Sequence, residues 1–277
     1  MTAVLDAPDR PATHTAARGG GLAGLLRGEW VKLRSLRSTW LSLAIGLVLM
    51  VLLGWLFTAT AESGGPGGDG GGPPGLSLTD PVGLSLAGYR LAQLAIGVLG
   101  VLLVTGEYSS GTIRSTFAAV PRRWPVVAAK AAVFSAVVFL GALVAGGTSF
   151  LVGQASLGDL GVGLGADGVV RALLGLALYL TAIGLSGMAL GWLLRSTAGA
   201  ISTLFGLVFL LPVLGALLPS SWGPDVVRLL PGEAGAQVFA LVPAPDALDP
   251  WAGFAVLVGY LVVAFGAATV LLHRRDA

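Results

Sequence analysis

The residues best suited to recognition lie in one short polar segment, Gly106–Pro125, between two long apolar runs. This segment holds a carboxylate, several hydroxyl groups, two glycines and three arginines, and both flanking runs are long enough to cross a bilayer. Charged and hydroxyl side chains on a compact connector can pair and hydrogen-bond with a soluble protein. The segment therefore predicts a binding surface for a soluble partner.

The residue types needed for catalysis are scarce. The chain has no cysteine, and its two histidines, His14 and His273, lie near opposite ends, outside the apolar blocks. No paired carboxylates occur inside those blocks, and neither Lys32 nor Lys130 follows the glycines of a GxxxxGK[ST] phosphate loop. We expect no catalytic, cofactor or metal site, so energy from a nucleotide must come from another subunit.

The composition is that of a membrane protein. Of 277 residues, 55% are hydrophobic and 11% charged, whereas soluble domains carry about 25% charged residues. The net charge is only +2, and the basic residues cluster at the ends of apolar blocks without interleaved aromatic side chains. This pattern argues against nucleic-acid binding.

Six apolar blocks each approach or exceed the ~20 residues that cross a bilayer as a helix. We place them at residues 40–60, 84–105, 126–153, 170–194, 198–218 and 251–272. The predicted fold is all-α and polytopic, with residues 21–277 as a single domain after a disordered tail at 1–20. Residues 64–75 are rich in Gly and Pro and predict a flexible outer loop, whereas 219–250 predicts short helices that dip into the outer leaflet.

The distribution of Lys and Arg predicts the orientation, because cytoplasmic loops carry an excess of both. With both termini inside, thirteen of the sixteen basic residues are cytoplasmic: Arg10, Arg18, Arg27, Lys32, Arg34, Arg37, Arg114, Arg122, Arg123, Lys130, Arg195, Arg274 and Arg275. Fourteen Arg against two Lys, with abundant Ala, Gly and Leu, is typical of a GC-rich bacterial genome. We therefore expect a multi-pass protein of the bacterial cell membrane with cytoplasmic termini.

A basic amphipathic helix is predicted just before the first span, at residues 22–37. Its apolar residues recur at spacings of three and four, which places them on one helical face: Leu22, Leu25, Leu26, Trp30 and Leu33. Arginines and Lys32 occupy most of the other positions. Such a helix lies in the cytoplasmic membrane surface; the alternative is an ordinary positively charged flank.

Within the polar connector, Ser109 or Ser110 can cap a short helix and Gly111 allows a sharp turn or a close backbone approach. Ile113 and Phe117 are four residues apart and give that helix a small apolar face. Pro121 ends the helix, since the residue before a proline avoids the α conformation. The alternative is a plain cytoplasmic loop.

Charged and small residues inside the apolar blocks are further candidates. Arg90 either snorkels to the outer interface or lines a path with an acidic partner, and Lys130 is expected to be an interfacial anchor. Three glycines on one face of the fourth block predict close helix packing, within the bundle or between two chains. They are Gly184, Gly187 and Gly191.

The chain resembles the permease subunits of ATP-binding-cassette transporters of the type-2 (exporter) class. The most specific likeness is Glu107-Tyr108-Ser109-Ser110-Gly111-Thr112-Ile113, which is similar to the family pattern E-x-x-x-G-T between the second and third spans. The segment Glu29–Arg34 resembles the family's connecting helix, and the apolar outer loop before the sixth span resembles its paired re-entrant helices.

The resemblance implies that the polar connector is a coupling helix that docks on a separate ATPase subunit. It makes Glu107, Gly111, Thr112 and Ile113 coupling residues, with Arg114, Arg122 and Arg123 as auxiliary contacts, and Glu29, Trp30, Lys32 and Arg34 as connecting-helix residues. It further implies two permease chains, two ATPase subunits that hold ATP and Mg, and no enzymatic activity of this chain. The alternative function is a membrane anchor, sensor or immunity protein that transports nothing.

Overall fold

The computed structural model describes residues 21–35, 37–61, 80–120, 123–215, 217–219, 221–243 and 246–274. The predicted tail at 1–20 and the Gly/Pro-rich loop at 64–75 lie outside these residues. Throughout the described part the chain is helical and has no strand. The elements are α1 (Leu22–Ser35), α2 (Arg37–Ala61), α3 (Pro81–Leu86), α4 (Tyr89–Ser109), α5 (Thr112–Ala119), α6 (Trp124–Leu157), η1 (Gly158–Leu160), α7 (Val169–Leu194), α8 (Thr197–Phe205), η2 (Gly206–Leu210), α9 (Leu211–Gly215), α10 (Gly223–Val227), α11 (Pro231–Ala236) and α12 (Pro250–Arg274).

The prediction of six membrane-spanning segments is confirmed, since six stretches in the described residues are helical, long and apolar enough to cross a membrane. They are Thr39–Ala61, Pro81–Ser109, Trp124–Leu160, Val169–Leu194, Thr197–Gly215 and Pro250–Leu272. The short helices expected between the fifth and sixth spans are present as α10 and α11. Each predicted block overlaps one of these stretches, and the third stretch runs beyond the predicted end at 153 to Leu160.

The second span is interrupted, which hydropathy did not reveal. Asp80 caps the short helix α3 by accepting a hydrogen bond from the backbone N–H of Gly83 at 2.8 Å, with Pro81 in the first turn. Ala87 and Gly88 form a turn with helical backbone angles between α3 and α4. A Cβ atom at Gly88 would overlap the backbone of Met50 in α2, so this turn lies against α2 at a distance that only glycine permits.

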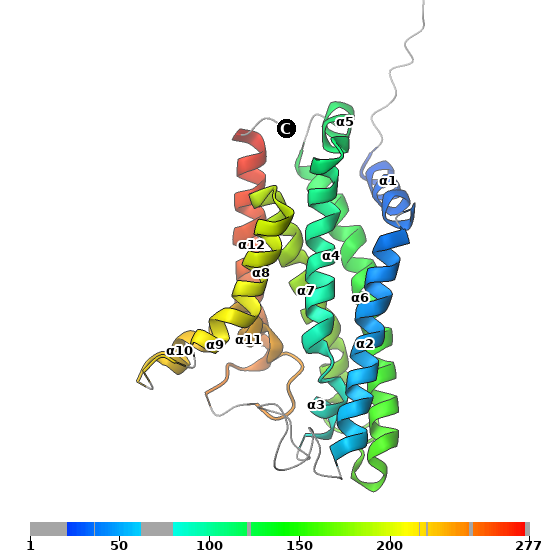
Figure 1. The fold of residues 1–277 in the computed structure, drawn as a ribbon, viewed down its shortest axis with the longest axis vertical. Coiled ribbons are helices and arrows are strands. Elements are labelled where there is room, and N and C mark those ends of the chain that lie inside the picture. The colour runs from blue at the N-terminus through cyan, green and yellow to red at the C-terminus, as the bar shows by residue number, and fades with distance from the viewer. Residues whose placement is uncertain are drawn as a thin grey trace, which may run out of the picture.

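Helices α2, α4, α6 and α7 form the main bundle, and α7 is the most deeply buried of the six spans (Figure 1). α4 and α6 pack on α7, and α12 packs against it as well. One apolar core runs through this bundle and contains Ile96, Phe134, Leu176 and Trp192, each almost completely buried. α7 is thus the central helix around which the others are arranged.

The interface between α4 and α7 is built on small residues. A Cβ atom at Gly187 would overlap the carbonyl oxygen of Gly97, and one at Gly100 would overlap the carbonyl oxygen of Gly184. A Cβ at Gly191 would press on Val104 at 3.1 Å. Gly187 and Gly191 therefore face α4 within the same chain, whereas a Cβ atom at Gly184 would overlap Phe134 of α6 as well as Ile96 of α4. These small residues let the backbones of α4 and α7 come into direct contact.

Helix α8 starts beside the ends of α4 and α7, but the segment that follows it leaves the bundle. The π-helical η2 and the short helices α9 and α10 lean away from the other spans, as Figure 1 shows in yellow. Their large apolar side chains are widely exposed, among them Val213, Leu217 and Trp222. This arm has few contacts with the rest of the described fold.

The two ends of the bundle differ. α1 and α5 lie at one end, together with the last turn of α12, whereas α3 lies at the other end (Figure 1). α1 packs on α6 and α5 packs on the end of α4. The segments identified from the sequence as connecting and coupling helices therefore share one end of the molecule.

We predict that Gly187→Ala lowers the free energy of unfolding by about 1–3 kcal/mol, because the added methyl group must displace the α4 backbone. Gly147→Ala in α6 is the matched control, since no atom lies within 4 Å of its added Cβ. There the higher helix propensity of alanine leaves stability unchanged or slightly increased. Thermal unfolding of both variants in detergent measures the difference, and equal midpoints would contradict the packing described for α4 and α7.

Candidate functional site

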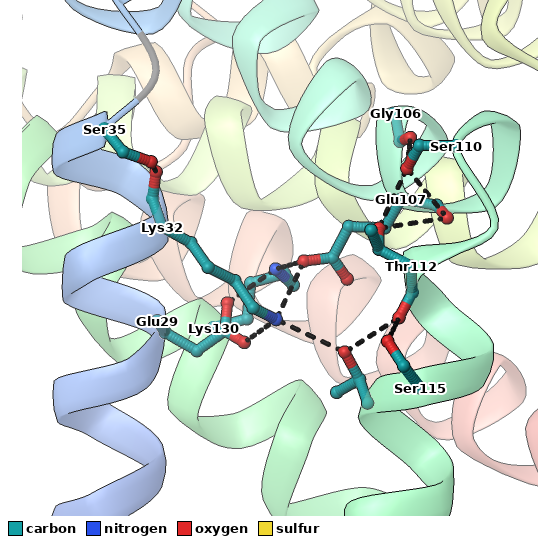
Figure 2. Close-up of polar contacts among 10 residues, drawn as sticks. Glu29, Lys32, Ser35, Gly106, Glu107, Ser110, Thr112, Ser115 and Lys130 are labelled. Carbon is teal, nitrogen blue, oxygen red and sulfur yellow. Dashed lines mark hydrogen bonds and ion pairs between the residues drawn. The ribbon is translucent and has the colours of Figure 1, made fainter.

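Four charged side chains from three helices meet where α1, α4, α5 and α6 converge (Figure 2). Glu29 and Lys32 come from α1, Glu107 from the last turns of α4, and Lys130 from the start of α6. We call these four residues the charge cluster. Glu107 is the first residue of the E-x-x-x-G-T pattern. The most specific motif of the sequence therefore contributes a residue to this cluster.

Lys130 is the centre of the charge cluster. Its Nζ donates to Oε2 of Glu29 at 2.6 Å and to Oε1 of Glu107 at 2.8 Å, and only 4% of the residue is exposed. Its prediction as an interfacial anchor is therefore wrong. A charged ammonium group at this depth requires carboxylate partners to offset its desolvation, and α1 and α4 supply one each.

Lys32 closes the cluster from the more exposed side. Its Nζ donates to Oε1 of Glu29 at 2.8 Å, to Oε1 of Glu107 at 3.1 Å and to the Thr116 hydroxyl of α5 at 3.4 Å. The two lysines thus bridge the same pair of carboxylates, and the four formal charges sum to zero. Through these contacts one polar group connects α1, α4, α5 and α6.

The pKa values of the α1 residues are consistent with this pairing. Burial alone would raise the pKa of Glu29, but the charges and hydrogen bonds of Lys130 and Lys32 outweigh burial and hold it below its ordinary value. Burial would likewise lower the pKa of Lys32, whereas Glu29 and Glu107 raise it above its ordinary value. Both α1 residues are therefore fully charged at neutral pH.

The polar connector folds as a turn followed by a short helix. Gly111 adopts a φ of +72°, a left-handed conformation that glycine accepts more readily than other residues. The space around its α-carbon is open, so this glycine is needed for the turn and not for a close approach of another backbone. Thr112 begins α5, and its hydroxyl lies 2.8 Å from that of Ser110. The carbonyl of Thr112 accepts hydrogen bonds from Ser115 and Thr116 at 2.8 and 3.1 Å. The turn is therefore fixed by local hydrogen bonds.

The apolar face predicted for the connector points into the protein. Ile113 is 2% exposed, and the ring of Phe117 stacks on Trp192 of α7 with centroids 6.4 Å apart. The guanidinium of Arg123 lies over the Phe117 ring and donates to the carbonyl of Leu272 in α12. Phe117 thus attaches the connector to α7 and Arg123 attaches it to α12, while Ile113 is buried beneath the connector.

The outer surface of the connector is polar. Thr112, Arg114 and Ser115 are exposed on α5, and Ser109 and Ser110 are exposed just before it. On α1, Trp30 and Arg34 are exposed, whereas Leu25 and Leu26 are half-buried and Leu33 is buried. Arg122 lies outside the described residues. The exposed part of the described connector is therefore a small hydroxyl-rich face with one arginine, Arg114.

Sequence reasoning missed the pairing of Glu29 with Lys130, although a signal was present. Lys130 lies inside an apolar block, and charges there are almost always paired. The acidic residues on the same predicted side of the membrane, Glu29 and Glu107, were its natural partners. Arg90, the other candidate inside a block, is exposed at the start of α4 with its guanidinium 5.5 Å from the centre of the Tyr89 ring.

We predict that Lys130→Met destabilises the protein by about 3–5 kcal/mol, because it leaves two buried carboxylates facing one another with only Lys32 to pair them. Adding Glu29→Gln should restore part of the loss, since one unpaired charge is then removed. Arg114→Met, an exposed position on α5, is the control and should leave the unfolding temperature unchanged. If Lys130→Met and Arg114→Met unfold at the same temperature, the charge cluster does not hold these helices together.

Comparison with known proteins gives one informative match. The family model described as ABC-2 family transporter protein matches residues 87–277, which include α4, the polar connector and Lys130. No curated protein matches the chain. The family match covers more than half of the 277 residues. The chain therefore belongs to the ABC-2 family of membrane transporter proteins.

Proposed function

We propose that this protein is the membrane-spanning permease subunit of an ATP-binding-cassette exporter, driven by a separate cytoplasmic ATPase subunit. The family and the six apolar helices support a membrane protein with a transport role. The excess of Lys and Arg on one side supports an orientation in which α1 and α5 face the cytoplasm. In this assembly ATP and Mg bind to the partner, and this chain supplies the path.

The charge cluster is the observation that carries the proposal. It connects the α4–α5 corner to α1 and to the start of α6 through hydrogen bonds of 2.6–3.1 Å among buried or half-buried groups. A force applied to α5 therefore acts on three other helices at once. This arrangement suits a coupling helix, which must pass the closing motion of an ATPase to the membrane spans.

The ATPase docks on the hydroxyl-rich outer face of α5 and the preceding turn, with α1 as a second contact. Arg114 supplies the charge on α5, and Trp30 and Arg34 are exposed on α1. In this scheme Glu107 and Ile113 contribute from inside, by holding the coupling helix on the bundle. Gly111 sets the turn that presents it.

A second permease chain covers the arm formed by η2, α9 and α10. The arm exposes large apolar side chains, and its short helices are separated by turns of irregular backbone. Such backbone is not tolerated against lipid and must be buried in protein at membrane depth. The rest of the described chain does not pack over this arm. We therefore assign that role to a second permease chain.

We predict that Arg114→Glu reduces co-purification of the partner ATPase by at least tenfold, because a charge reversal at the centre of a contact adds repulsion. Arg228→Glu is the matched control: Arg228 is also exposed but lies beside α10, on the side opposite α5 in the proposed orientation. Equal recovery of the ATPase with both variants would argue against docking on α5. If the unmodified protein also recovers no ATPase, the result favours the alternative function, a membrane anchor or sensor.

We predict that a cysteine introduced at Leu217, 80% exposed beside α9, cross-links to a second permease chain in native membranes through a flexible bis-maleimide. The chain has no cysteine of its own, so one introduced thiol reports one position. Val263→Cys in α12, 72% exposed, is the control for random collisions in lipid. Mass spectrometry of the product tells a second copy from a different chain. Cross-linking no greater than at Val263 would remove the support for this interface.

A further inference from the structure

A cavity of about 540 Å³ lies beside the charge cluster, between α1, α2, α4 and α6. Its volume is within the range of pockets that bind small molecules. All four residues of the charge cluster line it, together with hydroxyl groups such as Ser35, Thr39 and Ser110. The family match and the proposed coupling role assign no ligand to this cavity.

The wall of the cavity away from the cluster is apolar. Leu103 and Leu99 precede Glu107 on α4 by four and eight residues, so they lie roughly 6 and 12 Å farther along the helix, toward the middle of the bundle. Leu102 also lines the cavity and is 43% exposed, which shows that this wall reaches the outer surface of the bundle. The cavity is therefore polar at the end of the bundle and apolar toward its centre.

The polar end has unused hydrogen-bonding capacity of both kinds. Oε2 of Glu107 is buried and has no hydrogen-bond partner among the described residues, although a buried carboxylate oxygen normally accepts one. Lys130 carries three N–H donors and uses two of them, on Glu29 and Glu107. The cluster can thus receive one cationic donor and one anionic acceptor while its own formal charges remain balanced.

We propose that this cavity binds a zwitterionic phospholipid with a phosphoethanolamine head group, taken from the cytoplasmic leaflet. The ammonium group donates to Oε2 of Glu107, the phosphate accepts from Lys130, and the start of an acyl chain lies along Leu103 and Leu99. A lipid in the inner leaflet has this direction, with its head at the membrane surface and its chains toward the centre. The proposal depends on the cytoplasmic placement of α1 and α5 and not on the ATPase.

Head-group chemistry makes the proposal specific. A phosphocholine head carries the same charges, but its quaternary ammonium has no N–H to donate to Glu107. A phosphatidylglycerol head has no cation and would place a net negative charge beside a neutral cluster. We therefore expect binding about tenfold weaker for both, the effect of losing one hydrogen bond to a charged group.

Native mass spectrometry of the delipidated full-length chain tests this, with three phospholipids that share the same acyl chains and differ only in the head group. The expected result is one ethanolamine lipid retained per chain, and about tenfold less of the choline and glycerol lipids. Equal retention of all three overturns the proposal. Because the measurement needs neither an ATPase nor transport, its failure is separate from a failure of the proposed coupling function.

Two variants locate the site. Ser42→Phe adds bulk to the cavity wall from α2 and should abolish retention of the ethanolamine lipid. Ile45→Phe lies one turn farther along α2, at an exposed position that does not line the cavity, and should retain it. Retention that is unchanged in Ser42→Phe shows that the lipid binds elsewhere and overturns the assignment. Neither variant alters the charge cluster, so both keep the interactions that hold α1 and α5.

Discussion

The two lysines and two glutamates of the charge cluster set the geometry of the end of the bundle that carries α1 and α5. Lys130 and Glu29 are more than nine-tenths buried, so the free energy of their desolvation is offset only while their partners stay in place. Those partners lie on α1, α4 and α6, which are far apart in the sequence. None of these helices can move away from the others without leaving a buried charge unpaired. The cluster therefore makes these helix ends one mechanical unit.

A second constraint extends this unit along the bundle. The backbones of α4 and α7 touch at Gly97 and Gly187 and at Gly100 and Gly184, where even one methyl group would overlap a neighbouring carbonyl oxygen. Close-packed helices have little room to slide past one another. A displacement of α4 at the charge cluster is thus passed to α7, the central helix. The polar contacts hold one end, and the glycine contacts hold the middle.

The sequence predicted the parts of this structure that depend on local composition. Long apolar blocks located six spans, and Gly111 before a short helix marked the turn of the polar connector. The sequence did not predict features that depend on distant contacts. The spacing of Ile113 and Phe117 correctly gave an apolar face, but only the position of Trp192 on α7 decides that this face is buried. Likewise, Lys130 looks like an anchor until Glu29, 101 residues away, is placed beside it.

The helix ends joined by the charge cluster are firmly held, whereas the arm formed by η2, α9 and α10 is exposed. This difference bears on how the protein works. α8 meets the unit through a hydrogen bond between Thr197 and Thr105 at 2.9 Å, and η2, α9 and α10 then lean away. α12 meets it near the same end, where Arg123 donates to Leu272. The start of α12 is also held, because it packs on α11 and α7, and a Cβ atom at Gly253 would overlap the carbonyl oxygen of Ala234. If α5 is the point of force, α8 is held where the force enters, and η2, α9 and α10 beyond it are freest to move.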